Sequence, residues 1–158
     1  MMPPLVILRP EPGAGASLQS ALALGLDAWA FPLFVTAPRD WAPPPPDAFD
    51  ALLLGSANAL RHGGEALALY AGKPPYCVGK ATAREASAHG LIVAARGQGG
   101  LQAMLDMIAP GHTRLLRLAG EERVVLNPPP GLSLDERVVY DSMPVAMPVE
   151  LARLLCVH

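Results

Sequence analysis

Short apolar runs alternate with helix-like segments along most of this chain. Residues 51–54 and 75–78 are largely apolar runs, and each is followed by a small polar turn and then by an alanine-rich segment. An apolar run of about four residues is typical of a strand that is buried on both faces, as strands of parallel sheets are. The alternation therefore predicts an α/β fold, with a parallel sheet flanked by helices.

The same pattern gives approximate bounds for the elements. Strands are predicted at residues 5–8, 28–31, 51–54, 75–78, 91–94, 114–118 and 136–140. Helices are predicted at residues 14–24, 57–70, 81–89 and 99–108, with a short helical segment between 148 and 155. Gly25 follows the first helix and is its expected stop. Residues 127–131 read Asn-Pro-Pro-Pro-Gly and must form a loop, because proline lacks the amide donor that a helix needs.

Proline also marks the predicted domain boundaries. Four consecutive prolines end the segment 33–46 and favour an extended connector over a packed element. We therefore expect a strand and a helix within residues 1–32, an intact α/β lobe over 47–143, and a return linker and tail over 144–158.

Composition and charge exclude several classes of protein. Hydrophobic residues make up 51% of the chain and charged residues 16%, which favours a packed core over disorder. The net charge of −2 offers no field to hold nucleic acid. Cys77 and Cys156 lie far apart in the sequence without a nearby histidine pair, so neither a zinc site nor a disulfide framework is indicated. Without a long apolar span or a signal peptide, we expect a cytoplasmic protein with no membrane partner.

Candidate chemistry gathers where strands are predicted to end. Ser56 and Thr82 each follow a strand and precede a helix, where hydroxyls and free backbone N–H groups can hold carboxylates or phosphates. Tyr140 closes the last predicted strand, where it is either a structural aromatic at the sheet edge or a proton donor. No nucleophile–histidine motif of a hydrolase is found.

Taken in order, these segments resemble the uroporphyrinogen-III synthase family. The matching pieces are 6–10, 31–33, 49–59, 77–83 with 89–90, 116–123 and 138–140. The resemblance implies two similar α/β lobes, of which this chain would hold one complete flavodoxin-like lobe and only the N-terminal strand and helix of the other. The family's usual C-terminal half would be missing, so that the chain would be a truncated member lacking one wall of the cleft between the lobes.

The resemblance also implies an activity and a set of site residues. The family cyclises hydroxymethylbilane, a small-molecule substrate with eight carboxylates, to uroporphyrinogen III, with loss of water, inversion of ring D and no cofactor or metal. By this resemblance Tyr140 would protonate the departing hydroxyl, a role for which bound water is the alternative. The residues that would bind substrate are Arg9, Ser56, Asn58 and Thr82. For Arg9, pairing with Glu11 or with a loop carbonyl is the structural alternative.

Three functions stay open at this point. The chain would be a lyase of tetrapyrrole biosynthesis, a catalytically impaired fragment or tetrapyrrole-binding module, or a partner-binding domain unrelated to tetrapyrroles. An incomplete lobe would expose an apolar helix face and two sheet edges, so we also expect self-association or domain swapping through residues 1–32.

Overall fold

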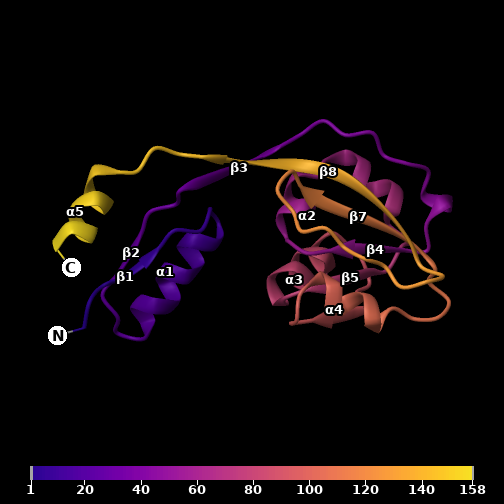
Figure 1. The fold of residues 1–158 in the computed structure, drawn as a ribbon, viewed down its shortest axis with the longest axis horizontal. Coiled ribbons are helices and arrows are strands. Elements are labelled where there is room, and N and C mark those ends of the chain that lie inside the picture. Colours follow the sequence, from indigo (N-terminus) through magenta and orange to yellow (C-terminus); the bar gives the residue numbers. More distant parts are fainter. Residues whose placement is uncertain (1, 158) are drawn as a thin grey trace. The chain divides into compact units, whose positions relative to one another are not determined.

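The computed structural model describes residues 2–157, and the chain divides into two units. The larger unit runs from Pro38 to Asp141, and the smaller one combines the residues up to Ala37 with those from Ser142 onward. The strands of the larger sheet are β3 (Phe34–Pro38), β4 (Ala51–Leu54), β5 (Pro75–Val78), β6 (Ala95–Gly97), β7 (Arg114–Gly120) and β8 (Ser133–Pro144). Their order across the sheet is β3-β8-β7-β4-β5-β6 (Figure 1).

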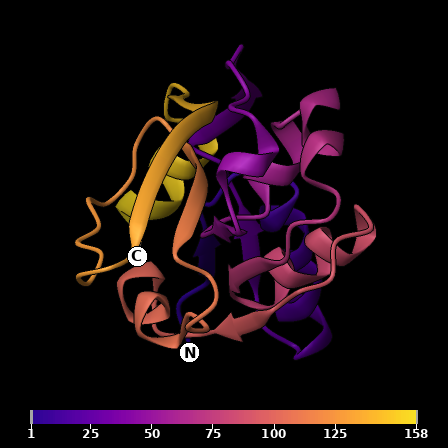
Figure 2. The same ribbon diagram turned by 90° about the vertical axis from the view of Figure 1, so that its right-hand side faces the viewer.

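The five strands from β4 to β8 form a parallel sheet, as the apolar runs predict. β4 pairs in parallel with β5 and β7, β5 with β6, and β7 with β8. Figure 2 shows β7 and β8 lying side by side. The bounds of β4 and β5 agree with the prediction, and the expected α/β class with a parallel sheet flanked by helices is confirmed.

Both faces of this sheet are covered. The helices of the larger unit are α2 (Asn58–His62), α3 (Lys80–Ala88) and α4 (Leu101–Met104), with short 3-10 helices at Pro46–Ala48, Glu65–Tyr70 and Leu105–Met107. Leu52 and Leu54 of β4 belong to the core that includes α2 and α3, whereas Ala51 and Leu53 belong to the core that includes α4. Because successive side chains of a strand point to opposite faces, one four-residue strand supplies both cores.

Two predicted helices are shorter than expected. The sequence predicts one helix over 57–70, but α2 ends at His62, and residues 65–70 form a separate 3-10 helix. Gly64 lies between them with a φ of 73°, a left-handed conformation that a helix cannot include. The helix predicted over 99–108 is likewise reduced to α4 and the 3-10 helix that follows it.

The strand predicted over 91–94 is wrong, because β6 lies at Ala95–Gly97. Leu91 is buried in the core and Ile92 is 84% exposed, so this apolar segment returns the chain from α3 to the sheet edge. The backbone N–H of Ala94 donates to the Pro75 carbonyl (2.8 Å), and the pairing with β5 begins only there.

The proline-rich segment 33–46 is more ordered than the sequence predicts. Its first part is β3, and the N–H of Arg39 donates to the carbonyl of Val139 in β8 (3.0 Å). Pro44 is buried, and its carbonyl accepts a hydrogen bond from the Tyr70 hydroxyl (2.6 Å). The expected extended connector is therefore a strand followed by a segment packed on the lobe.

No helix connects β7 to β8, as the prolines predict. Residues 121–132 instead form a loop whose Leu126 is buried in the core beside α4. The amide of Gln102 in α4 holds this loop by two hydrogen bonds of 2.9 Å, one from the Asn127 N–H and one to the Asn127 carbonyl. A pinned loop thus replaces a helix on this part of the sheet.

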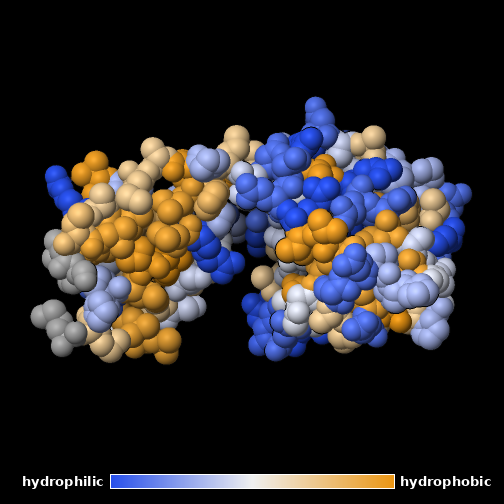
Figure 3. Space-filling view, viewed as in Figure 1, coloured by the Kyte–Doolittle hydropathy of each residue, from blue (hydrophilic) through white to orange (hydrophobic). Residues whose placement is uncertain are grey.

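The smaller unit is built from both ends of the chain. Strands β1 (Leu5–Ile7) and β2 (Ala28–Ala30) pair in parallel, and the unit also contains α1 (Gly13–Ala23) and α5 (Val149–Val157). Hydrophobic side chains gather on the face of this unit that is seen in Figure 3. The exposed apolar side chains of the unit include Leu24 and Trp29. Self-association through this unit stays a prediction.

Asp50 ties the beginning of β4 to that of β7. One carboxylate oxygen accepts the backbone N–H groups of Thr113 and Arg114 (both 2.9 Å), and the other accepts from the Arg114 guanidinium (2.8 Å). The hydrogen bond from the Arg114 side chain, and then that from Thr113, hold the pKa of Asp50 far below its ordinary value.

We predict that Asp50→Asn lowers thermal stability at neutral pH, because the amide cannot accept all three hydrogen bonds. The pKa of Asp50 is depressed in the folded state, so its stabilising effect is present above the ordinary carboxyl pKa of about 4 and fades as the pH falls below that value. The difference in Tm between wild type and variant, measured by circular dichroism, should therefore narrow in acid. Asp106→Asn, at an exposed position, is the control, and a difference that did not change with pH would contradict the assignment.

Candidate functional site

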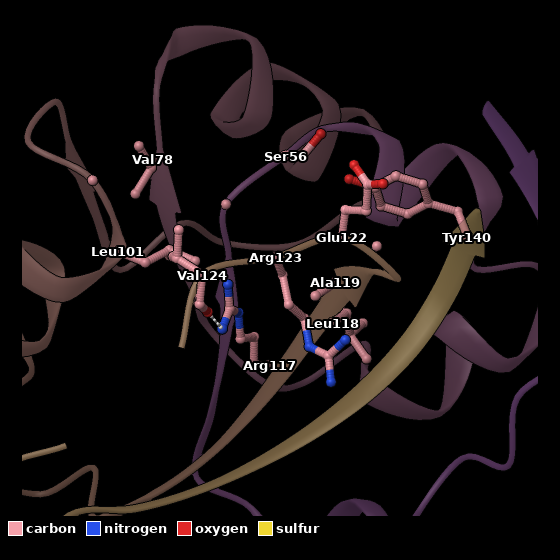
Figure 4. Close-up of a pocket in the computed structure, with 13 residues that line it drawn as sticks. Ser56, Val78, Leu101, Arg117, Leu118, Ala119, Glu122, Arg123, Val124 and Tyr140 are labelled. Carbon is pink, nitrogen blue, oxygen red and sulfur yellow. Dashed lines mark hydrogen bonds between the residues drawn. The ribbon is translucent and has the colours of Figure 1, made fainter. Parts of the chain in front are cut away.

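A cavity of about 270 Å³ opens at the carboxyl edge of the parallel sheet (Figure 4). The walls come from the turn after β4, the end of β5, the end of β7 with its following loop, the start of α4, and Tyr140 within β8. Its polar lining residues are Ser56, Arg117, Glu122, Arg123 and Tyr140.

The topology of the sheet explains why the cavity lies here. From β4 the chain continues to β5 on one side, whereas β7 pairs with β4 on the other side. The chain leaves β4 toward β5 and leaves β7 toward β8, in opposite directions across the sheet. The two connections therefore diverge and open a crevice outside the carboxyl ends of β4 and β7. Ligands of open α/β sheets bind in such crevices. The cavity is therefore in the place where this fold class binds small molecules.

The turn after β4 brings Ser56 to the cavity. Gly55 lets this turn pass close to α4, because a Cβ at this position would lie 2.8 Å from the Cδ1 atom of Leu101 and that side chain would have to move. The Ser56 hydroxyl oxygen accepts the backbone N–H of Asn58 (3.2 Å), which fixes the side chain at the entrance to α2. Its own O–H can still donate to a ligand.

Tyr140 reaches the cavity from β8, the strand that pairs with β7. It lies opposite Gly120 across the β7–β8 ladder, and a Cβ on Gly120 would come within 2.7 Å of the Tyr140 ring. The ring also contacts that of His62, with centroids 5.9 Å apart. Burial, and then the nearby charge of Arg61, lower the pKa of His62. The imidazole beside Tyr140 is consequently uncharged at neutral pH.

Two arginines and a glutamate form a network beneath this cavity. Arg117 is 3% exposed and donates from Nη1 to a carboxylate oxygen of Glu136 (2.9 Å) and to the Val124 carbonyl (2.8 Å). Arg123 donates from Nε to the other carboxylate oxygen (3.0 Å). Burial raises the pKa of Glu136, but the hydrogen bonds from Arg123 and Arg117 outweigh it and leave the pKa below its ordinary value. Glu136 is therefore ionised and holds both guanidinium groups.

The structure brings together only some of the residues predicted from the sequence. Ser56 and Tyr140 line the same cavity, although 84 positions separate them in the sequence. Asn58 lies next to Ser56, and its side-chain oxygen accepts from Nη1 of Arg61 (3.2 Å). Thr82 is only 4% exposed within α3 and is not among the residues that line the cavity.

Arg9 belongs to the smaller unit, so the geometry of the cavity does not include it. Its Nη1 donates to the Ser17 hydroxyl (3.3 Å). Glu11, the partner considered from the sequence, instead accepts the backbone N–H of Gly15 (3.0 Å).

The arginine network was not predicted from the sequence. A charge within the apolar segment 115–119 was a usable signal, because charged residues are rarely buried without a partner. The partner Glu136 could not be found in this way, because only the register of β7 against β8 places it opposite Arg117.

Two further observations concern metal sites and membrane-spanning helices. Within residues 2–157, no group of three or more histidine, cysteine, aspartate or glutamate side chains could hold a metal ion. The described helices include none with the length and apolar character needed to cross a membrane.

Comparisons with known proteins agree with the resemblance seen in the sequence. Residues 17–156 match the model of the family described as uroporphyrinogen-III synthase HemD. The crystal structure of uroporphyrinogen-III synthetase from Helicobacter pylori 26695 has a similar fold, with a TM-score of 0.58 at 17% identity over 98% of this chain and 68% of that one. A mutant uroporphyrinogen III synthase from the extremely thermophilic bacterium Thermus thermophilus matches with a TM-score of 0.49 at 19% identity, over 89% of this chain and 64% of that one.

The chain thus spans about two thirds of the length of these two proteins. No curated protein matches it.

We predict that Gly120→Ala displaces the Tyr140 ring. The new Cβ would lie 2.7 Å from two ring carbons, and the ring can swing away more readily than the strand can move. Stability should fall modestly, toward the lower end of the range of about 1–3 kcal/mol seen for overpacking. The ring proton shifts of Tyr140 and His62 in NMR spectra report the displacement. Gly72→Ala, where a Cβ meets open space, should leave those shifts unchanged, and unchanged shifts in Gly120→Ala would contradict the close packing.

Proposed function

The chain belongs to the uroporphyrinogen-III synthase family, and from this premise we propose that it binds hydroxymethylbilane and closes it to uroporphyrinogen III. The reaction joins the two ends of a linear tetrapyrrole, releases water and inverts ring D. The protein would then act as a lyase of tetrapyrrole biosynthesis, in the cytoplasm.

The observation that carries this proposal is the meeting of Ser56 and Tyr140 in one cavity. Ser56 comes from the turn after β4 and Tyr140 from β8, and both line the cavity at the carboxyl edge of the sheet together with Arg117 and Arg123. Hydroxyl and guanidinium donors are the groups that hold carboxylates. A substrate with several carboxylates and a hydroxyl leaving group matches this combination of donors.

In the proposed reaction, Tyr140 donates its phenolic proton to the departing hydroxyl, which leaves as water. Electrons of the pyrrole nitrogen assist this departure, and a carbon of ring D then forms a bond to the freed methylene group. For ring D to be inverted, the bond that joined it to its existing bridge breaks and re-forms at the other α-carbon of ring D. That carbon loses its proton, which restores the Tyr140 phenol. The uncharged imidazole of His62 lies against the Tyr140 ring and adds no positive charge to it. Most of the rate enhancement would come from holding the chain ends in the reacting geometry.

A second candidate function is a binding module that holds acidic tetrapyrroles without closing them. The observation that favours this alternative is that every residue lining the cavity lies within the larger unit, so this unit by itself presents the donors for a carboxylate ligand.

We predict that the protein converts hydroxymethylbilane to uroporphyrinogen III faster than the substrate closes spontaneously to the I isomer. Separation of the two isomers by chromatography after oxidation, with and without protein, measures this directly. Binding of the tetrapyrrole with only the I isomer as product would favour the binding module. Absence of both binding and the III isomer would contradict any tetrapyrrole function.

We predict that Tyr140→Phe lowers kcat for formation of the III isomer, by up to the factor of about 10²–10⁴ typical of general-acid catalysis, with KM little changed. Tyr76→Phe removes a phenol oxygen outside the cavity, one that contacts Nδ1 of His112 at 2.7 Å. This control should lower stability without a comparable loss of kcat. An unchanged kcat in Tyr140→Phe would assign the proton to water instead.

A further inference from the structure

We propose that one edge of the Arg117 guanidinium, formed by Nε and Nη2, is a carboxylate-binding site within the cavity. The identity of the ligand as a polycarboxylate rests on the proposed function. The presence of a carboxylate site is independent of the proposed function, because it follows from the arrangement of hydrogen-bond donors around Arg117.

The hydrogen bonds of Arg117 are all on one side of the guanidinium. Nη1 donates both to Glu136 and to the Val124 carbonyl. The Nε atom is buried and has no hydrogen-bond partner among residues 2–157. Nη2 likewise makes no hydrogen bond within the part of the chain that the structure describes. Two parallel N–H groups are therefore left on the edge that binds a carboxylate through both of its oxygens.

The position of Arg117 places its side chain in the wall of the cavity. The residue lies on β7 opposite Leu53 of β4, which places it at the switch point of the sheet. It lines the cavity although its side chain is 3% exposed. A buried donor without a partner is destabilising, so a ligand that supplies acceptors there gains binding energy that a surface arginine could not provide.

The surrounding charges also favour an anion. Among the residues that the structure describes, Glu136 is the one carboxylate bound to Arg117, and it is shared with the guanidinium of Arg123. Glu122 also lines the cavity, but Figure 4 shows its carboxylate apart from Arg117 and close to the Tyr140 ring in this view. Two guanidinium groups share one carboxylate in this network, so a positive charge remains next to the free edge.

The binding of acetate, a simple carboxylate, tests the site without requiring any enzymatic activity. In a two-dimensional ¹H–¹⁵N NMR spectrum, we expect the Nε–H signal of Arg117 to move downfield as acetate is added and to move further with uroporphyrin III, a stable octacarboxylate. The signal is assigned to Arg117 by its absence from the spectrum of the Arg117→Lys variant. A signal unmoved by both ligands would overturn the proposal.

Substitutions give a second and independent measurement. Arg117→Lys keeps the charge and can still pair with Glu136 but lacks the two-donor edge, so it should weaken uroporphyrin III binding at least about tenfold. Arg84→Gln removes a positive charge at an exposed position outside the cavity and should leave the affinity unchanged. Circular dichroism melts establish that each variant is folded. Equal affinities for wild type and a folded Arg117→Lys would also overturn the proposal.

These measurements separate the two proposals. If acetate moves the Arg117 signal but the protein forms no III isomer, the carboxylate site holds and the proposed function fails. If the III isomer forms while the Arg117 signal and the affinity of Arg117→Lys are unchanged, the function holds and this site fails.

Discussion

The structure of the larger unit depends on the burial of β4 on both faces. Its side chains alternate between the core shared with α2 and α3 and the core shared with α4, and β5 and β7 cover its two edges. Because all four of its residues are buried, the strand has little freedom to shift its register. A strand fixed in this way determines where the turn at Gly55 and Ser56 emerges, and therefore where the cavity lies.

The side of the sheet beside β7 and β8 is built differently from the rest. The connection between these strands is a loop without a helix, held by the paired amides of Gln102 and Asn127 and by the buried Leu126. The carbonyl of Val124 in this loop accepts one of the Arg117 hydrogen bonds. A helix satisfies its own carbonyls, whereas an extended loop leaves them free to bind a buried arginine.

The cavity combines groups that serve the fold with groups that remain available. The Ser56 oxygen orders the entrance to α2, and Glu136 neutralises part of the charge of two arginines. The groups available toward the cavity include the Ser56 hydroxyl, the Tyr140 phenol and the guanidinium of Arg117, with Arg123 and Glu122 also in the lining. The donors among them suit carboxylates, as the proposed binding of hydroxymethylbilane requires.

The sequence by itself determined the α/β class, the bounds of β4 and β5, the absence of a helix after β7, and the family. These depend on local information: apolar runs, proline, and residue order. The broken helix at Gly64 and the position of β6 required the structure, since Leu91 and Ile92 look alike in sequence although only Leu91 packs into the core. The pairing of strands that are distant in sequence determined which residues form the candidate site. Only the order of strands in the sheet places Tyr140 and Arg117 in one cavity and leaves Thr82 outside it.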